Sequence, residues 1–527
     1  MLYENEKKAG KDMKTTTQDL IFYQIYPKSF CDSNGDGTGD VQGVISKIDY
    51  LKSLGVNAVW LTPFYKSPNV DNGYDISDYQ AIQEDVGTLE EVEKMLALFH
   101  EKGIKVIFDL VANHTSTEHK WFQESRKSKD NPYRDYYIWR KTPPNDWEST
   151  FGGSAWEYDK TTGEYYLHSF AIEQADLNWD NPKVREEMKA VVDFWLAKGV
   201  DGFRCDVLDL ISKNWEKDEN YGGPHLHEYI RELFGREQTQ GIFTVGECWS
   251  ANAENMGLFC LPERNELTTA FAFKHLCVEN GRFYAHKPPL KEVCSRISQW
   301  QISTQETGVI PTVFLENHDQ PRSVSRFADD GKYRYESATM LGAIVLTHYG
   351  VPFLMQGQEI GATNSYHSDI SEIVDVESLN YYHMNKGKIP EEEMIEAINF
   401  GGRDNPRHLM PWDETPPKKA WMAPYSRQAE INVKADLAAE KSVFRFYQKL
   451  IALRKAEPCL KGGRYALSAL TDEYYAYERT LGESKITVVC NLGKACAFDG
   501  VEGELLLSNY PSVGKTLQPY QVAIYKK

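Results

Sequence analysis

The chain has 527 residues, of which 41% are hydrophobic and 26% are charged, and its formal net charge at pH 7 is −18. A chain of this length exceeds one simple hydrophobic core, so we expect two or three domains of an ordinary globular protein. The acidic balance disfavours nucleic acid or an anionic membrane surface as the main partner.

Strand and helix patterns alternate over the first 113 residues. Short, apolar, β-rich runs predict strands at 21–27, 57–63 and 104–111, and helical periodicity occupies 44–54 and 89–102. The strand runs do not alternate between apolar and polar residues, which is typical of parallel strands buried on both faces.

The alternation stops at residue 114 and resumes after residue 181. The stretch between is rich in Trp, Tyr, Pro, Gly and charged residues and has no long amphipathic period. Because it is far longer than a strand-to-helix loop, we interpret it as an inserted subdomain. Beyond it, helices are predicted at 183–198 and 228–235, and strands at 199–206, 241–247, 269–273, 312–319 and 350–357.

About eight strand-and-helix units indicate an α/β protein built on a TIM-type (β/α)8 barrel. We expect the barrel to comprise residues 1–113 and 182–464, with the inserted subdomain, 114–181, after its third strand. Residues 465–527 alternate and contain little helical pattern. They predict a C-terminal all-β domain, which we interpret as a β-sandwich.

We expect no disulfide framework, no signal peptide and no membrane-spanning segment. Nine cysteines are scattered without a C-x-x-C pair, which favours reduced thiols over a disulfide framework. Residues 1–20 are polar and lack the apolar run of a signal peptide. The most apolar segment, 340–355, is interrupted by Gly350 and Pro352 and is too short to cross a bilayer. We expect a cytoplasmic protein without membrane association, monomeric or weakly homo-oligomeric.

Charged and polar residues end or follow several predicted strands. In a TIM barrel these carboxyl ends form the rim on which the chemistry takes place. Each residue alone has a structural interpretation, since a lone Asp after a strand is more often a helix cap. Together they would place several carboxylates and two imidazoles in one pocket. The residues are Asp109, Asn113, His114, Arg204, Asp206, Glu247, His318 and Asp319.

Paired carboxyls across a pocket suit the hydrolysis of an acetal. One must stay protonated to donate to the leaving oxygen, and the other must be ionised to attack the sugar carbon. Arg204 lies two residues before Asp206 and therefore on the same strand face. We expect it to lower the pKa of Asp206, as a nucleophile requires. Glu247 has no adjacent cation in sequence and is the better general acid.

Five motifs in order resemble the α-amylase family of glycoside hydrolases: DLVANH (109–114), QADLNW (174–179), DGFRCDV (201–207), GEC (246–248) and ENHD (316–319). The resemblance covers essentially the whole chain. It implies a retaining double displacement with Asp206 as nucleophile, Glu247 as acid/base and Asp319 as transition-state stabiliser. Within NGYDISDY (72–79), it implies that Asp75 grips and Tyr74 stacks the terminal glucose. The other substrate-binding residues that it implies are His114, Phe170, Arg204, Val207, His318 and Arg403.

The segment DSNGDGTGD (32–40) is a candidate metal loop. The alternative is an Asx-rich turn that holds no ion. The bidentate Glu of an EF-hand is absent, since Gly43 stands at that position. Because related barrel glucosidases carry a similar loop, we expect one structural Ca2+ or Mg2+, no catalytic metal and no organic cofactor. The expected ligands are Asp32, Asn34, Asp36, Thr38 and Asp40.

The closest resemblance within the family is to the oligo-1,6-glucosidase, isomaltase and dextran-glucosidase branch. In that branch a Val after the nucleophile accompanies α-1,6 specificity, and here it is Val207. The alternative interpretation is an ordinary β-branched strand residue. We therefore expect an exo-acting α-1,6-glucosidase whose substrate is a small isomalto-oligosaccharide.

Three other activities, and one role without activity, remain as alternatives. Within the enzyme class they are an α-1,4-glucosidase, a trehalose-6-phosphate hydrolase and a sucrose-active glucosidase or isomerase. The departures Ala175, CWSANAEN after Glu247 and RHLMPWD (407–413) lie on the aglycone side and bear on this choice. A non-enzymatic scaffold on the same fold is disfavoured because all three catalytic acids are present.

Overall fold

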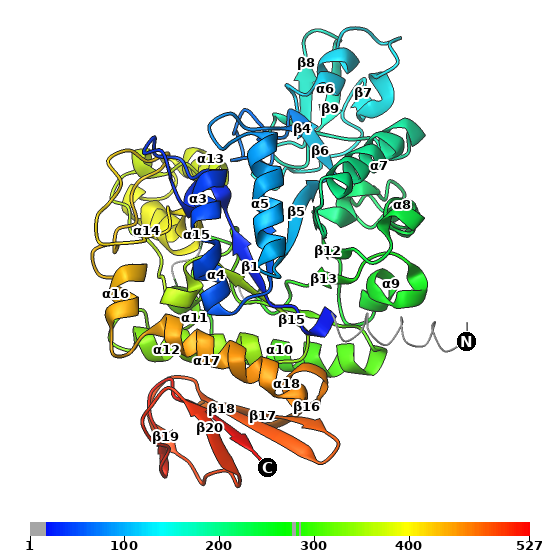
Figure 1. Ribbon diagram of the computed structural model, residues 1–527. Helices are drawn as coiled ribbons and strands as arrows, with labels where there is room; N and C mark the ends of the chain where they lie inside the picture. The colour runs from blue at the N-terminus through cyan, green and yellow to red at the C-terminus, as the bar shows by residue number, and fades with distance from the viewer. Residues whose placement is uncertain (1–16, 277–280, 284–285) are drawn as a thin grey trace.

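The computed structural model describes residues 17–276, 281–283 and 286–527. Its centre is an eight-stranded parallel sheet with the order β13-β12-β11-β5-β2-β1-β15-β14 (Figure 1). The strands are β1 (Phe22–Ile25), β2 (Ala58–Leu61), β5 (Lys105–Val111), β11 (Gly202–Asp206), β12 (Phe243–Glu247), β13 (Thr269–Phe271), β14 (Thr312–Val313) and β15 (Val351–Met355).

The two edge strands of this sheet lie against each other. The hydroxyl of Thr269 in β13 donates to the carbonyl oxygen of Ile310 (2.7 Å), and that of Thr312 in β14 donates to the carbonyl oxygen of Ala270 (3.2 Å). The sheet is therefore a nearly closed barrel, which confirms the predicted (β/α)8 fold.

Helices pack around the outside of the barrel (Figure 1). Their ends follow the sequence: Thr88 forms a capping box with Glu91 at the start of α5, and Asn181 caps α7, where Pro182 occupies the first turn. The helices from the first half are α2 (Pro27–Phe30), α3 (Val41–Ser46), α4 (Ile48–Leu54), α5 (Leu89–Glu101), α7 (Pro182–Ala197), α8 (Leu226–Phe234) and α9 (Met256–Cys260). The later ones are α10 (Leu290–Thr307), α11 (Ser323–Phe327), α12 (Arg334–Thr347), α13 (Val376–Asn385), α14 (Glu391–Gly401), α15 (Asp404–Arg407), α16 (Val433–Ala438), α17 (Val443–Ala456) and α18 (Pro458–Gly462).

The stretch after the third barrel strand folds into short elements above the barrel (Figure 1). β10 returns antiparallel to β6, with Asp176 opposite His114, so the chain leaves and re-enters the barrel at one place. A separate three-stranded antiparallel sheet has the order β7-β9-β8. The elements are β6 (His114–Ser116), α6 (Lys120–Ser125), β7 (Trp139–Arg140), β8 (Trp156–Asp159), β9 (Glu164–Leu167) and β10 (Gln174–Asp176). The antiparallel pair β3 (Tyr65–Lys66) and β4 (Asp78–Ile82) precedes them in the chain.

The C-terminal residues form an all-β unit below the barrel, as predicted (Figure 1). A five-stranded antiparallel sheet has the order β16-β17-β18-β22-β20, and β19 pairs with β21. A buried arginine of β17 joins this unit to the barrel. Arg479 donates to the carbonyl oxygen of Thr347 (2.6 Å). The strands are β16 (Arg464–Leu470), β17 (Tyr474–Leu481), β18 (Ser484–Asn491), β19 (Cys496–Ala497), β20 (Glu504–Ser508), β21 (Thr516–Leu517) and β22 (Val522–Lys526).

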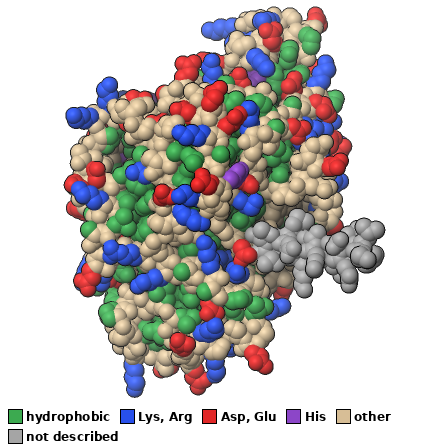
Figure 2. Space-filling view, in the orientation of Figure 1, with side chains coloured by type: hydrophobic (Ala, Val, Ile, Leu, Met, Phe, Trp, Pro, Cys, Tyr) green, Lys and Arg blue, Asp and Glu red, His purple; other side chains and the backbone are tan. Residues whose placement is uncertain are grey.

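Acidic and basic side chains are interspersed over the face of the molecule seen in Figure 2. Among the described helices, none has the length and apolarity needed to cross a bilayer. Eight of the nine cysteines lie in the described residues and carry free thiols, whereas Cys277 lies outside them.

Candidate active site

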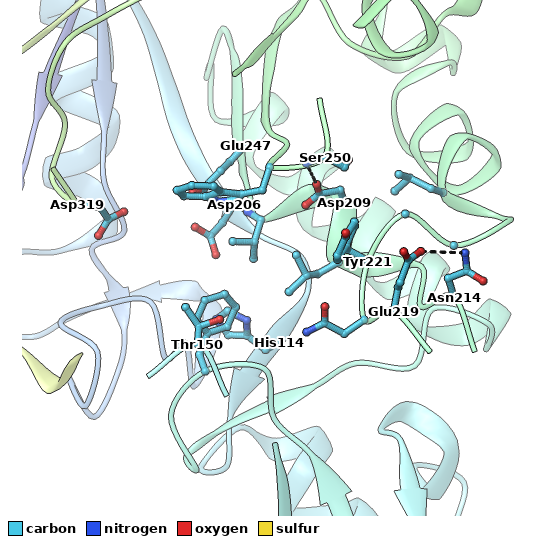
Figure 3. A pocket seen from close by; sticks show the side chains of 18 of the residues that line it. His114, Thr150, Asp206, Asp209, Asn214, Glu219, Tyr221, Glu247, Ser250 and Asp319 are labelled. Carbon is cyan, nitrogen blue, oxygen red and sulfur yellow. Dashed lines mark hydrogen bonds between the residues drawn. The ribbon is translucent and has the colours of Figure 1, made fainter. Parts of the chain in front are cut away.

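A cavity of about 830 Å3 opens at the carboxyl ends of the barrel strands. Asp206 is the last residue of β11 and Glu247 the last of β12, and Asp319 lies in the loop after β14. Figure 3 shows the three side chains gathered around the same hollow. Thr150, Phe151 and Phe170, from the segment above the barrel, form the opposite wall. The fold therefore brings the three predicted catalytic residues into one pocket.

Arg204 lies beneath these acids, with 1% of its surface exposed. Its Nη1 donates to Oδ1 of Asp206 (2.6 Å) and to Oδ1 of Asp109 (2.9 Å), and its Nη2 donates to Oε2 of Glu247. The parallel register of β5 and β11 places Arg204 directly opposite Asp109. One guanidinium thus contacts three buried carboxyls, and the expected contact with Asp206 is among them.

Burial is the largest influence on the pKa values of Asp206 and Glu247. It raises the pKa of Asp206 to about 7, against the opposing effect of Arg204 and with a further increase from the charge of Asp109. It likewise raises the pKa of Glu247 to about 7, and the charges of Asp206 and Asp319 add to the increase. The expectation that Arg204 leaves Asp206 with a lowered pKa was therefore wrong. Arg204 acts in the expected direction, but the loss of water outweighs it.

The pKa of Asp319 is shifted in the opposite direction, downward. Burial alone would raise its pKa, but contacts with His318, Arg407 and Arg403 hold that pKa well below its usual range. His318 Nε2 lies 2.9 Å from Oδ2 of Asp319, and Arg407 Nη2 donates to Oδ1 at 2.7 Å. Asp319 therefore stays ionised where Asp206 and Glu247 can hold a proton.

Tyr74, His114, His318 and Phe170 all line the cavity. The ring of Tyr74 stacks on His318 with 5.1 Å between the centroids, and its hydroxyl donates to Oδ2 of Asp109 (2.9 Å). His114 lies 5.2 Å from Phe170, centroid to centroid. These rings form an aromatic floor and side wall next to the acids, suited to a sugar ring.

Asp75 does not line this cavity, so its predicted contact with the sugar was wrong. Its buried carboxylate accepts hydrogen bonds from the hydroxyl of Ser67 and from the N–H groups of Val70 and Asp71, and so shapes its own loop. The acid that this loop presents to the cavity is Asp71. Both stand in VDNGYD, and nothing in that string distinguishes the inward carboxylate from the one that holds the turn.

Arg403 lines the cavity and is held by acids on three sides. Its Nη2 donates to Asp71 (2.9 Å) and its Nε to Asp375 (2.7 Å), while its Nη1 lies 3.5 Å from Asp319. It therefore contacts the innermost part of the pocket. The reasoning from sequence did not single out Asp71, Arg407, Trp249, Arg282 and Glu377 as site residues, since they lie outside the predicted strands.

Val207 lines the cavity with a left-handed backbone, φ 35° and ψ 48°. A β-branched residue rarely adopts this conformation, which costs on the order of 1–3 kcal/mol. The strained backbone points the Val207 N–H at Oε2 of Glu247 (3.2 Å). Val207 thus contacts the acid through its backbone and the cavity through its side chain.

The candidate metal loop is a series of Asx turns. Asp32 accepts hydrogen bonds from the N–H groups of Asn34, Gly35 and Gly37, Asn34 accepts one from Asp36, and Asp36 accepts one from Thr38. The carboxylate of Asp40 is occupied otherwise: Oδ1 caps α3 at Gly43 and Oδ2 binds Ser33. Within the described part of the chain, no three His, Cys, Asp or Glu side chains cluster as metal ligands.

Comparison with known proteins relates this architecture to characterised ones. Residues 24–463 match the family model of the alpha-amylase catalytic domain. The chain is 44% identical to an oligo-1,6-glucosidase of Parageobacillus thermoglucosidasius over 97% of this chain and 98% of that protein. It is 42% identical to the trehalose-6-phosphate hydrolase of Bacillus subtilis over 96% and 97%.

Among solved structures, it resembles a mutant of Bacillus licheniformis trehalose-6-phosphate hydrolase with a TM-score of 0.91 and 39% identity, covering 97% of this chain and 99% of that one. It also resembles the trehalulose synthase MutB of Pseudomonas mesoacidophila with a TM-score of 0.92 and 37% identity, at the same coverage.

Proposed function

The chain belongs to the α-amylase family of glycoside hydrolases, and from this premise we propose that it is a retaining exo-α-glucosidase that removes terminal α-1,6-linked glucose from short isomalto-oligosaccharides. The observation that carries the proposal is the buried Arg204, which contacts both Asp206 and Glu247 at the floor of the cavity. Two carboxyls with raised pKa values beside an ionised third suit a double displacement at a sugar carbon.

The first step forms a glucosyl ester. Asp206 attacks C1 of the terminal glucose while the bond from C1 to the leaving oxygen breaks, and Glu247 gives its proton to that oxygen. The reactive state therefore has one proton on the pair. Because the charge of ionised Asp206 raises the pKa of Glu247, ionisation of Asp206 favours the proton on Glu247. Asp319, held ionised, stabilises positive charge at C1.

The second step uses water. Glu247, now a carboxylate, takes a proton from the water molecule while the water oxygen bonds to C1 and Asp206 leaves as a carboxylate. Asp71 and Arg403 hold the glucose hydroxyls from the far side of the pocket, and Tyr74 and Phe170 cover its ring faces. Because these groups enclose one sugar, the enzyme acts on chain ends.

The lining of the cavity bears on whether the leaving sugar is phosphorylated. Apart from Asp71, Asp206, Glu247, Asp319 and Arg403, which surround the innermost sugar, the described lining residues include three acids and three of Lys or Arg. This lining carries no excess of cations for a phosphate group. The α-1,6 preference is supported by Val207 and by the oligo-1,6-glucosidase relatives. The α-1,4, trehalose-6-phosphate and sucrose activities are the outcomes that the test must separate.

We also propose that the loop of Asp32, Asn34 and Asp36 holds one structural Ca2+ or Mg2+ with the carbonyl of Thr38. Successive Asx turns gather the side-chain oxygens of Asp32, Asn34 and Asp36, and hard cations prefer such oxygen ligands. Asp40 is the fifth expected ligand, and both its oxygens accept hydrogen bonds from the protein, as do both oxygens of Asp32. A cytoplasmic, monomeric or weakly associating enzyme completes the proposal.

A hydrolysis panel tests the function. The purified protein is assayed on isomaltose, isomaltotriose, panose, maltose, sucrose, trehalose and trehalose-6-phosphate. The proposal expects the highest kcat/KM on isomaltose or isomaltotriose, with release of α-glucose that reports retention. Faster turnover of maltose or of trehalose-6-phosphate would refute the α-1,6 assignment while leaving the mechanism intact.

A further inference from the structure

Asp71 reaches the cavity from a turn with a strained backbone. The turn runs from Asn69 to Asn72, and both asparagines have left-handed backbones, with φ 65° and φ 49°. Asparagine tolerates this conformation better than most residues, but the conformation persists only where the surroundings fix it. Asp71 lies between the two asparagines and is buried. The direction of its carboxylate therefore depends on what holds the two ends of the turn.

Lys28 holds both asparagines with one ammonium group. Its Nζ donates to Oδ1 of Asn69 (3.4 Å) and to Oδ1 of Asn72 (3.3 Å). Hydrogen bonds from a charged donor are stronger than those between neutral groups. Tyr26, two residues earlier, donates from its hydroxyl to the carbonyl oxygen of Asn72 (3.1 Å). A single cation thus ties the two ends of the turn together, and a neighbouring hydroxyl supports one of them.

Lys28 is itself held in place. It lies in the short helix α2, and its Nζ is 4.2 Å from the centroid of the Trp421 ring, which attracts a cation over its face. The indole Nε1 of Trp421 donates to Oγ of Ser29 in the same helix (3.1 Å), so the ring is anchored beside the lysine. Burial lowers the pKa of Lys28 to about 8, which leaves most of the ammonium protonated at neutral pH.

The Asp71 carboxylate bridges two donors. Its Oδ1 accepts from Nη2 of Arg403 (2.9 Å), and its Oδ2 accepts from Nε2 of Gln174 (3.2 Å). Arg403 in turn contacts Asp319, with 3.5 Å between Nη1 and Oδ1. A shift of the turn would therefore move a sugar-holding carboxylate relative to the acids. A misplacement of about 1 Å in such a group can cost about 100-fold in rate.

We propose that Lys28 is a positioning residue for the innermost sugar: it fixes the turn from Asn69 to Asn72 and thereby the direction of Asp71. Lys28 is not among the described residues that line the cavity, so it acts on the sugar through Asp71. The inference rests on the proposed glucosidase function, in which Asp71 holds glucose hydroxyls, and deepens it.

Lys28→Met tests the proposal, because Met keeps an unbranched side chain and removes the ammonium. The ratio kcat/KM should fall about tenfold on p-nitrophenyl α-glucoside and by a similar factor on isomaltose, since both place a glucose in the innermost site. The Kd of the glucose-shaped inhibitor deoxynojirimycin, measured by calorimetry, should rise. Lys28→Arg keeps the charge and offers several N–H donors, so it should recover most of the loss.

Lys47→Met is the matched control. The Nζ of Lys47 also lies 4.2 Å from an indole centroid, that of Trp412, and Lys47 too is partly buried. This variant should leave kcat/KM and the Kd of the inhibitor unchanged.

A double variant tests the route through Asp71. If Lys28 acts through Asp71, the losses are not additive, and Lys28→Met combined with Asp71→Ala should bind the inhibitor as Asp71→Ala alone does. Fully additive losses would overturn the inference. So would a fall in Tm of Lys28→Met without a change in kcat/KM or in Kd, which would show a structural role only.

The nitrophenyl substrate separates this inference from the proposed function. It contains only the innermost glucose, so its result decides the role of Lys28 even where isomaltose is not cleaved. If the wild type hydrolyses no α-glucoside, the proposed function fails and the inference fails with it.

Discussion

The guanidinium of Arg204 lies 2.6 Å from the carboxylate of Asp206, two residues later on the same strand. The same group also binds Asp109 and Glu247 and is almost wholly buried. Removing a buried cation that contacts three carboxyls would leave those carboxyls without their partner, which is strongly destabilising. The charge state of the site therefore depends on this one residue.

Replacing Arg204 by Gln should impair catalysis through protonation. Arg204 lowers the pKa values of Asp206 and Glu247 against burial, so its loss moves both upward. The acidic limb of the kcat/KM profile should rise by about one pH unit or more, and activity at pH 7 should fall at least about 100-fold. A kinetic pH profile measures this. Arg236→Gln, which removes a partly exposed pair with Asp193, serves as control, and an unshifted profile in Arg204→Gln would contradict the argument.

Asp206→Asn should abolish turnover without unfolding the protein. The amide cannot attack C1, yet it fills the same space and retains an acceptor for Arg204. Activity on isomaltose should fall by at least about 10^4-fold, with an unchanged circular dichroism spectrum. Asp209→Asn is the matched control, because Asp209 is also buried and also lines the cavity. Substantial residual turnover in Asp206→Asn would refute its role as nucleophile.

Glu247→Gln should stabilise the fold at alkaline pH. In the folded protein Glu247 has a pKa of about 7, whereas its ordinary value is 4.5. As pH rises from 4.5 to 7, ionisation favours the unfolded chain, so the penalty is largest above pH 7. By linkage this amounts to on the order of 3 kcal/mol at pH 8 and below about 1 kcal/mol at pH 5. Thermal unfolding at both values should give the larger gain in Tm at pH 8, and an equal gain at both would contradict the raised pKa.

Val207→Thr should shift the linkage preference. Both residues are β-branched, so the left-handed backbone is equally strained and the N–H bond to Glu247 is kept. The substitution replaces a methyl group by a hydroxyl on the cavity wall. The ratio of kcat/KM on isomaltose to that on maltose should fall severalfold, with Tm nearly constant. An unchanged ratio would show that Val207 is an ordinary strand-end residue.

Ion removal should lower stability more than activity. Elemental analysis after exhaustive desalting should find one Ca2+ or Mg2+ per chain, and chelation should lower Tm by several degrees, since binding to the folded state stabilises it. The rate constant kcat at 25 °C should change little. A variant with Asp32→Asn and Asp36→Asn should lose the response to chelator. Absence of a bound ion in the wild type would defeat the proposal.

Much of this protein could be predicted from its sequence. Unalternating strands with helices between them determine a parallel barrel, because both faces of such strands must be buried. Parallel strands of a barrel have their carboxyl ends on one rim, which is why Asp206, Glu247 and Asp319 could be assigned to one pocket. The period of two along a strand placed Arg204 beside Asp206.

Tertiary structure alone decided the features that depend on burial and on loops. The pKa of Asp206 follows from how completely water is removed, which no local string records. The choice between Asp71 and Asp75, and the contact between Trp249 and Glu247, depend on side-chain directions in loops. Sequence period determines direction along a strand. In a loop, direction is set by contacts that come from distant parts of the chain, such as Arg403 for Asp71 and Phe273 for Trp249.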